Sequence, residues 1–293
     1  MRGTRRPRVV QIGAREILAK GLPYGIWSDI SHRAITMRWP AFVGAVAALF
    51  LAVSCLFATL YTLGDKPVSN ADGGFLDHLF FSIETLTTVG YGDMHPRTTY
   101  GHLVASLELF TGVLTSAAIT GLFIYRFTRA TPRILFADVA TVASHDGRMS
   151  LMVRLANQRL NAISSAQARL WMLVSYVTAE GVPFRRFEEL RLLRDHSPLF
   201  TLSWTVIHAI DEASPMLGLD AGALAEQDAS FVVTIEGYDE TSGQTVRARK
   251  MYHAEHIRFG ARYADILEVQ DGHRTVLDYD RFHHTLEDGA EEA

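Results

Sequence analysis

A five-residue run, Thr-Val-Gly-Tyr-Gly at residues 88–92, constrains this chain more than any other feature of its sequence. Gly90 and Gly92 can adopt positive φ angles that a Cβ would penalise, so successive carbonyl groups can turn toward a common axis. A loop of this kind offers backbone oxygens in place of the water shell of a dehydrated cation. A cation on that axis must be surrounded by a closed ring of these oxygens, and one chain supplies only a quarter of the ring. The run therefore predicts four copies around an axis.

The sequence on either side of the run tests this interpretation, because short motifs also occur by chance. Two apolar segments, residues 40–63 and 103–127, are each long enough as helices to cross a hydrocarbon core of about 30 Å. Between them, residues 74–87 are apolar at helical spacing but too short to cross, which is typical of a re-entrant helix. The sequence therefore predicts a pore domain over residues 40–130, with two spans, a pore helix and a filter.

Basic residues indicate how the spans are oriented. They are abundant before the first span and after the second, whereas the connecting segment contains only Lys66 and Arg97. By the positive-inside rule, both termini are expected in the cytoplasm. The first apolar segment begins about forty residues into the chain and lacks the short pattern of a cleaved signal peptide, so we expect it to be a true span.

Ahead of the first span, residues 27–39 place Trp27, Ile30, Ala34 and Met37 near one face of a helix. Such a segment is expected to lie along the inner membrane surface, anchored by aromatic and basic residues, within a cytoplasmic amino-terminal region over residues 1–39. An ordinary cytoplasmic helix that packs on a β domain later in the chain is the alternative.

A second domain must follow the spans, because 293 residues with 48% hydrophobic content are too many and too polar for spans alone. From residue 131 to residue 285 the chain shows short alternating runs separated by turns, which predicts an antiparallel β sandwich. Asp146 and Gly147 read as the turn of a hairpin. Further strands are expected at residues 168–179, 199–210, 230–237, 244–252, 263–270 and 275–279, with one short helix at 219–227 and a disordered acidic tail at 286–293.

Composition and motifs argue against several classes of function. The net charge of −4 gives no reason to propose a nucleic acid partner, and the single cysteine, Cys55, excludes an intrachain disulfide framework. Nucleophile-elbow, zinc-protease, Walker and dinucleotide motifs are absent from the sequence, so we expect neither an enzyme nor a cofactor. His208 is a candidate pH sensor, although a hydrogen-bonded residue with no special task is the simpler interpretation.

The chain now resembles a known family, the inward-rectifier potassium channels, and its prokaryotic branch in particular. The resemblance rests on the sequence from Thr88 to Pro96, on residues 146–154 and 211–215, and on the order of the predicted elements. It implies a homotetramer in the bacterial inner membrane whose cytoplasmic immunoglobulin-like sandwich extends the pore, and K+ flux that passes inward more readily than outward. The implied K+ ligands are the backbone oxygens of Thr88, Val89, Gly90 and Tyr91, with K+ as the permeant ion and no cofactor.

The second span carries a stripe that recurs every four residues and would line a pore: Gly112, Ser116, Thr120 and Ile124. Ser116 falls where strongly rectifying relatives carry an acid, so strong block by polyamines is not expected. Ile124 is a candidate gate, because four apolar side chains can close a pore by dewetting. For Gly112, helix bending and close packing are both open; for Gly121 we expect packing.

Two acids at membrane depth require a role, because ionisable residues in spans are costly. The resemblance suggests that Glu84, in the pore helix, braces the filter from behind, and that Glu108 does likewise. The alternative is that Glu108 faces the cavity and concentrates cations.

Basic residues at the inner membrane boundary are candidate contacts for anionic lipids: Lys20, Arg33, Arg38, Arg126, Arg129 and Arg133. The positive-inside rule explains these charges without a specific lipid. The lipid interpretation is preferred only because the family that the chain resembles is regulated by lipids.

Two other functions remain open. One is a weakly selective cation channel, although such channels usually depart from this motif at the tyrosine, and Tyr91 is intact. The other is a membrane-anchored β-sandwich sensor whose filter-like loop does not conduct. The complete filter and its pore helix favour the potassium channel.

Overall fold

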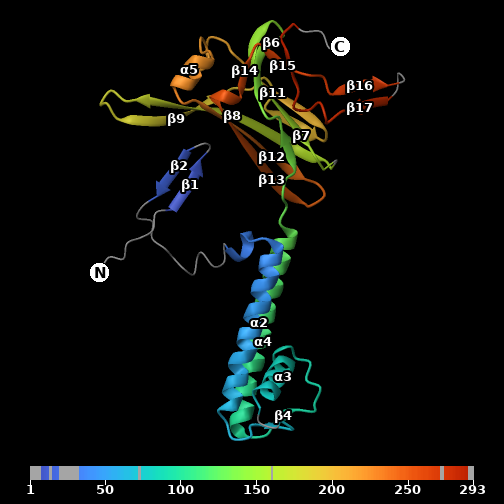
Figure 1. The fold of residues 1–293 in the computed structure, drawn as a ribbon. Helices are drawn as coiled ribbons and strands as arrows, with labels where there is room; N and C mark the ends of the chain where they lie inside the picture. The colour runs from blue at the N-terminus through green and yellow to red at the C-terminus, as the bar shows by residue number, and fades with distance from the viewer. Residues whose placement is uncertain are drawn as a thin grey trace. The chain divides into compact units, whose positions relative to one another are not determined.

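The computed structural model describes residues 8–12, 15–19, 33–71, 74–159, 161–270 and 274–289 (Figure 1). The chain divides into two compact units. One contains residues 21–129, and the other combines residues 1–20 with residues 130–293.

The described part of the unit of residues 21–129 contains three helices of 12 residues or more. They are α2 (Trp39–Thr62), α3 (Phe75–Leu86) and α4 (Thr99–Thr128), and Figure 1 shows α2 and α4 side by side with the short α3 against them. Two short strands, β3 (Val68–Ser69) and β4 (His95–Pro96), pair in antiparallel fashion beside α3.

Local sequence explains where the two long helices begin. Pro40 lies in the first turn of α2, where its missing N–H would have no partner in any case. The Thr98 hydroxyl accepts a hydrogen bond from the Gly101 N–H at 3.1 Å, which caps α4. With this cap, α4 begins four residues before the predicted second span. The bounds of α2 differ from those of the predicted first span by one residue at each end.

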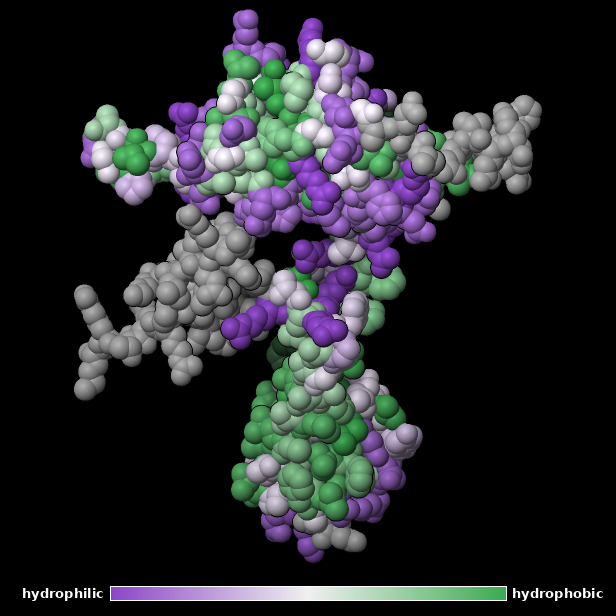
Figure 2. All heavy atoms as spheres, turned by 45° about the horizontal axis from the view of Figure 1, so that its top comes forward, coloured by the Kyte–Doolittle hydropathy of each residue, from purple (hydrophilic) through white to green (hydrophobic). Residues whose placement is uncertain are grey.

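Both long helices are long and apolar enough to cross a membrane. They expose large apolar side chains along their length, and Figure 2 shows hydrophobic surface over them. Exposed apolar surface of this extent requires a cover of lipid or of further protein copies.

Residues 27–32 of the expected interfacial helix lie outside the described residues, as does Lys20. Residues 33–36 form one helical turn just before α2. Further toward the amino terminus, β1 (Arg8–Ile12) and β2 (Arg15–Ala19) pair as an antiparallel ribbon that the sequence analysis did not predict.

Two five-stranded sheets form the sandwich of residues 130–293. In the first sheet, the order β10-β8-β12-β13 joins His196–Phe200, Ile163–Val177, Ser230–Asp239 and Gln244–His253, with β9 (Pro183–Leu190) also on β8. In the second, β11-β7-β6-β14 joins Ser203–Ala209, Arg148–Asn157, Ala140–His145 and Ile257–Phe259, with β5 (Ile134–Phe136) also on β7. Buried side chains of both sheets, including Leu151, Leu155, Leu170 and Phe231, make one core.

Smaller elements complete this unit. The helix α5 (Ala221–Glu226) and the 3-10 turn η1 (Ala254–His256) flank the strands. Two ribbons follow, one of β15 (Ala261–Tyr263) with β18 (Thr285–Glu287) and one of β16 (Leu267–Gln270) with β17 (Arg274–Leu277).

Several strand predictions need correction. The strand expected at residues 199–210 is two strands, because the chain leaves β10 after Phe200 and enters β11 of the other sheet at Ser203. The domain is not wholly antiparallel, since β14 pairs with β6 in parallel. Disorder from residue 286 is also wrong for Leu286 and Glu287, which pair with β15.

The predicted hairpin at Asp146 and Gly147 connects β6 to β7. Both turn residues have positive φ, 49° and 73°, as a two-residue turn with the twist of its strands requires.

His208, on β11, is buried with both ring nitrogens paired. Nδ1 lies 2.7 Å from the Arg191 carbonyl oxygen and Nε2 lies 2.7 Å from Ser214 Oγ. A carbonyl only accepts, so Nδ1 carries the proton and Nε2 accepts from the Ser214 hydroxyl. Burial lowers the pKa of this imidazole, and it outweighs the Arg191 carbonyl and the charge of Asp211, which both raise it.

This lowered pKa predicts acid sensitivity. Because the folded pKa lies below the usual value of about 6.5, the unfolded chain binds more protons below that pH, and stability is lost as pH falls from about 6.5. We expect His208→Gln, which does not titrate, to flatten the fall in the unfolding midpoint of purified protein between about pH 6.5 and 5. Equal slopes for the two proteins would show that His208 does not contribute.

Candidate functional site

The loop of residues 88–92 has an alternating backbone. Thr88, Gly90 and Gly92 have positive φ angles of 58°, 49° and 88°, and the two residues between them do not. Alternation of left- and right-handed residues turns successive N–H groups to one side and leaves the carbonyl groups on the other. Thr88 is β-branched, so its left-handed conformation costs about 1–3 kcal/mol, which is typical of a functional site.

Hydrogen bonds to the end of α3 fix the N–H side of this loop. The Glu84 carbonyl oxygen accepts from the N–H of Val89 at 2.9 Å and of Gly90 at 3.4 Å, and the Thr85 carbonyl accepts from Thr88 at 3.0 Å. Among the described residues, none donates to a carbonyl oxygen of residues 88–92. The carbonyl side of the loop is therefore free to coordinate a cation.

The orientation of α3 adds a favourable field. Its carboxyl end, at Leu86, leads directly into the loop, and its last turn carries no basic side chain. The helix macrodipole is equivalent to about half a negative charge at this end. Cations are thus favoured in the space beside the last turn of α3.

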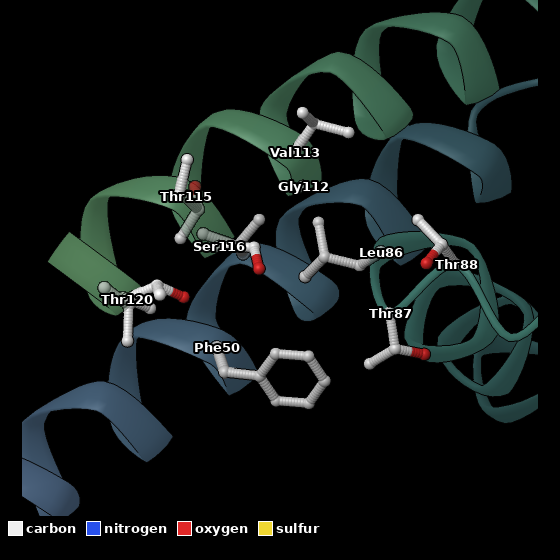
Figure 3. A pocket seen from close by; sticks show the side chains of 12 residues that line it. Phe50, Leu86, Thr87, Thr88, Gly112, Val113, Thr115, Ser116 and Thr120 are labelled. Carbon is white, nitrogen blue, oxygen red and sulfur yellow. The ribbon is translucent and has the colours of Figure 1, made fainter. Parts of the chain in front are cut away.

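A cavity of about 580 Å³ occupies that space. Figure 3 shows Thr87, just after α3, and Thr88 of the loop on one side of it and Ser116 and Thr120 of α4 on the other. The rest of the lining comes from both long helices and the end of α3: Phe50, Val53, Leu86, Gly112, Val113, Thr115, Ala117 and Ile119.

Three residues of the predicted stripe, Gly112, Ser116 and Thr120, line the cavity. The fourth, Ile124, lies one turn further along α4, outside the lining, with 56% of its surface exposed. Sequence reasoning missed Phe50 and Val53, because nothing in a single apolar span marks the side that meets the cavity.

Gly112 is required for close packing. A Cβ built at this position would lie 2.7 Å from the Leu86 carbonyl oxygen, so any side chain would push α4 away from the end of α3. At Gly121, by contrast, no atom of the described chain lies within 4 Å of such a Cβ. Packing inside the chain therefore does not explain Gly121.

The two predicted support acids differ in their surroundings. Glu108 is fully buried and accepts hydrogen bonds from the Tyr61 hydroxyl at 2.7 Å and from the Ser82 hydroxyl. It therefore joins α4 to α2 and α3 at once, and it is not among the residues that line the cavity. Glu84 acts on the loop through its backbone carbonyl; within the described chain its carboxylate has no hydrogen-bond partner.

The candidate lipid contacts also differ. The Arg126 guanidinium donates to the carbonyl oxygens of Ala34 and Met37, so its charge is engaged within the chain. Arg33, Arg38, Arg129 and Arg133 are exposed.

Comparisons with known proteins show which family this chain resembles. The profile described as "Inward rectifier potassium channel C-terminal domain" matches residues 134–291, and the one described as "Ion channel" matches residues 46–129. The chain is 36% identical to the inward rectifier potassium channel Kirbac3.1 of Paramagnetospirillum magnetotacticum, over 95% of this chain and 96% of that one. The chain belongs to the inward rectifier potassium channel family.

Animal members of the family match as well. The chain is 29% identical to the bovine ATP-sensitive inward rectifier potassium channel 12, over 89% of this chain and 66% of the relative. It is 32% identical to the mouse G protein-activated inward rectifier potassium channel 3, over 90% of this chain and 73% of the relative. These matches support K+ channel function, and they place the chain among channels and not among enzymes, as predicted.

Proposed function

We propose that this chain forms a homotetramer that conducts K+ through a ring of carbonyl oxygens from residues 88–92. The observation that carries the proposal is the pair of hydrogen bonds that the N–H groups of Val89 and Gly90 donate to the Glu84 carbonyl. These bonds hold the N–H groups on one side of the loop, so the carbonyl oxygens lie on the other side. Four loops then replace the water shell of K+. The coordinating carbonyl oxygens belong to Thr88, Val89, Gly90 and Tyr91.

Below the filter, K+ passes the hydroxyl groups of Ser116 and Thr120 and then a gate at Ile124. Both hydroxyl residues line the cavity, and Ile124 follows one turn later on α4, where four apolar side chains can meet and exclude water. Because Ser116 is neutral, cytoplasmic polyamines block this channel weakly.

The channel lies in the bacterial inner membrane with both termini in the cytoplasm, as the positive-inside distribution of basic residues indicates. The four exposed bases, Arg33, Arg38, Arg129 and Arg133, are the proposed contacts for anionic lipid headgroups. Glu108 supports the filter by holding α2, α3 and α4 together.

Flux into proteoliposomes tests this function. We expect purified wild-type protein to carry K+, to exclude Na+ and to be blocked by Ba2+, because the carbonyl ring fits a dehydrated K+ ion. Equal passage of K+ and Na+ would favour a weakly selective cation channel. The absence of measurable ion flux in every lipid mixture, with the tetramer intact, would favour an anchored sensor that does not conduct.

A further inference from the structure

The loop of residues 88–92 is held differently at its two ends. At its start, the carbonyl oxygens of Glu84 and Thr85 accept hydrogen bonds from the N–H groups of residues 88–90. At its outer end, no acceptor among the described residues holds the N–H group of Tyr91 or Gly92. The position of the outer end therefore depends on what holds the residues just after the loop.

Asn70 provides such a contact. Its side-chain Nδ2 lies 2.6 Å from the backbone carbonyl oxygen of Asp93, the first residue after the loop. A carbonyl oxygen only accepts, so the NH2 group of Asn70 is the donor. Asn70 also has a positive φ of 58°, a conformation that asparagine adopts more readily than most residues with a side chain. Both the hydrogen bond and the backbone at this position therefore favour asparagine.

Backbone pairing joins the segment that carries Asn70 to the segment after the loop. Ser69 of β3 lies opposite His95 of β4. Further from the loop, the Arg97 N–H donates to the Pro67 carbonyl oxygen at 2.8 Å. The two segments thus form one ribbon, and the Asn70 side chain extends this ribbon by one contact toward the loop.

Apolar packing anchors both partners of this hydrogen bond. Val68, at the start of β3, is a buried member of the hydrophobic cluster that α2, α3 and α4 form. Ala71 and Met94, which directly follow Asn70 and Asp93, pack against the same cluster. The hydrogen bond therefore joins two points that the core of the membrane unit holds in place.

We propose that Asn70 is a positioning residue for the filter: its hydrogen bond holds the Asp93 peptide and so keeps the Tyr91 carbonyl turned toward the axis. Carbonyl oxygens carry partial negative charge, so four that face one axis repel one another, and a K+ ion between them offsets the repulsion. The loop therefore needs this restraint most when K+ is scarce. The inference rests on the proposed channel function.

Two substitutions remove the donor in different ways. Asn70→Asp keeps the shape of the side chain, but an ionised carboxylate only accepts. Asn70→Gly removes the side chain and keeps a residue that adopts a positive φ without strain. An effect that both variants share therefore comes from the lost hydrogen bond, and neither a new charge nor backbone strain explains it.

Flux after a K+-free interval tests this role. Proteoliposomes are held for increasing times in Na+ medium or in K+ medium, and K+ uptake is then measured. We expect wild type to keep its uptake in both media and both Asn70 variants to lose uptake about tenfold faster in Na+ than in K+, because four hydrogen bonds are lost per tetramer. A variant that is merely less stable would lose uptake equally in both media, and that result would overturn the positioning role.

Lys66→Gly is the matched control. Lys66 lies four residues before Asn70, is exposed and has a positive φ of 46°, and its side chain has no hydrogen-bond partner within the described chain. The substitution thus removes a side chain from the same segment without removing a contact. We expect its uptake to last equally long in Na+ and in K+. Faster loss in Na+ for this variant as well would assign the effect to the whole segment and overturn the role of Asn70.

Thermal unfolding gives a test that does not need conduction. Bound K+ stabilises the folded tetramer, so the unfolding midpoint rises as K+ replaces Na+ at constant ionic strength. The half-saturating K+ concentration should rise about tenfold in both Asn70 variants and stay unchanged in Lys66→Gly, because a ring that is no longer held in place binds K+ more weakly. Equal half-saturating concentrations in wild type and both Asn70 variants would overturn the positioning role even if wild type did not conduct. The absence of flux from wild type would count only against the proposed channel function.

Discussion

Proteoliposomes that contain Gly90→Asp are expected to pass no measurable K+ while the variant still forms tetramers in normal yield. Gly90 has a φ of 49° and its N–H bonds to the Glu84 carbonyl, so its own carbonyl direction depends on a left-handed backbone. A Cβ in this region costs about 1–2 kcal/mol in each copy. No atom of the described residues lies within 4 Å of this Cβ, so in the proposed tetramer the carboxylate occupies space that the four copies share around the axis.

Gly147→Asp is the matched control for this experiment. Gly147 also has a positive φ, 73°, and open space for a Cβ, but it lies in the β6–β7 hairpin of the sandwich. The two variants therefore share the local backbone penalty and the new charge and differ only in position. Flux from Gly147→Asp should equal that of wild type; K+ flux retained by assembled Gly90→Asp would show that ions do not pass along residues 88–92.

The first span and the pore helix were predictable from sequence to within one residue at each end, because a bilayer of fixed thickness demands a minimum length of uninterrupted apolar sequence. The pore helix predicted at residues 74–87 is observed as Phe75–Leu86. The start of α4 was missed, since the polar residues that open it, such as Thr99 and His102, do not add to an apolar run.

The strands of the sandwich were harder to predict from sequence, because an alternating pattern predicts a strand but not the sheet to which the strand belongs. The pattern from residue 199 to residue 210 continues through the point where the chain changes sheets, so two strands read as one. The β9 strand (Pro183–Leu190) was missed because charged residues, among them Arg185, Arg186 and Glu188, occur on both of its faces. Among the described strands β9 pairs only with β8, so its other edge can carry such charges.

The polar contacts of the site were the least predictable part. Sequence alone indicates that a buried acid at membrane depth needs partners. It does not name them, since Tyr61 and Ser82 are 47 and 26 residues away from Glu108. Likewise, Arg126 reads as one base among several at the boundary, and its contact with Ala34 spans 92 residues.

Glu108→Ala is expected to destabilise the pore domain strongly. The substitution leaves the Tyr61 and Ser82 hydroxyl groups buried without their acceptor, and each such group costs roughly 1–3 kcal/mol. It also opens a cavity in the cluster that contains Phe57, Tyr61 and Phe81. Together these effects amount to about 3–5 kcal/mol per subunit, which should lower the apparent midpoint of thermal unfolding by about 10 °C or more.

Glu108→Gln separates the hydrogen bonds from the charge. An amide of the same shape keeps one acceptor oxygen, and its NH2 group can donate to the other hydroxyl, because a hydroxyl both donates and accepts. We therefore expect a loss of no more than about 1 kcal/mol for this variant, with K+ selectivity retained. Thermal unfolding of the purified tetramer, followed by its loss from size-exclusion chromatography, measures both variants. Equal losses for Ala and Gln would mean that a charged carboxylate, and not the geometry of its hydrogen bonds, holds the three helices together behind the filter.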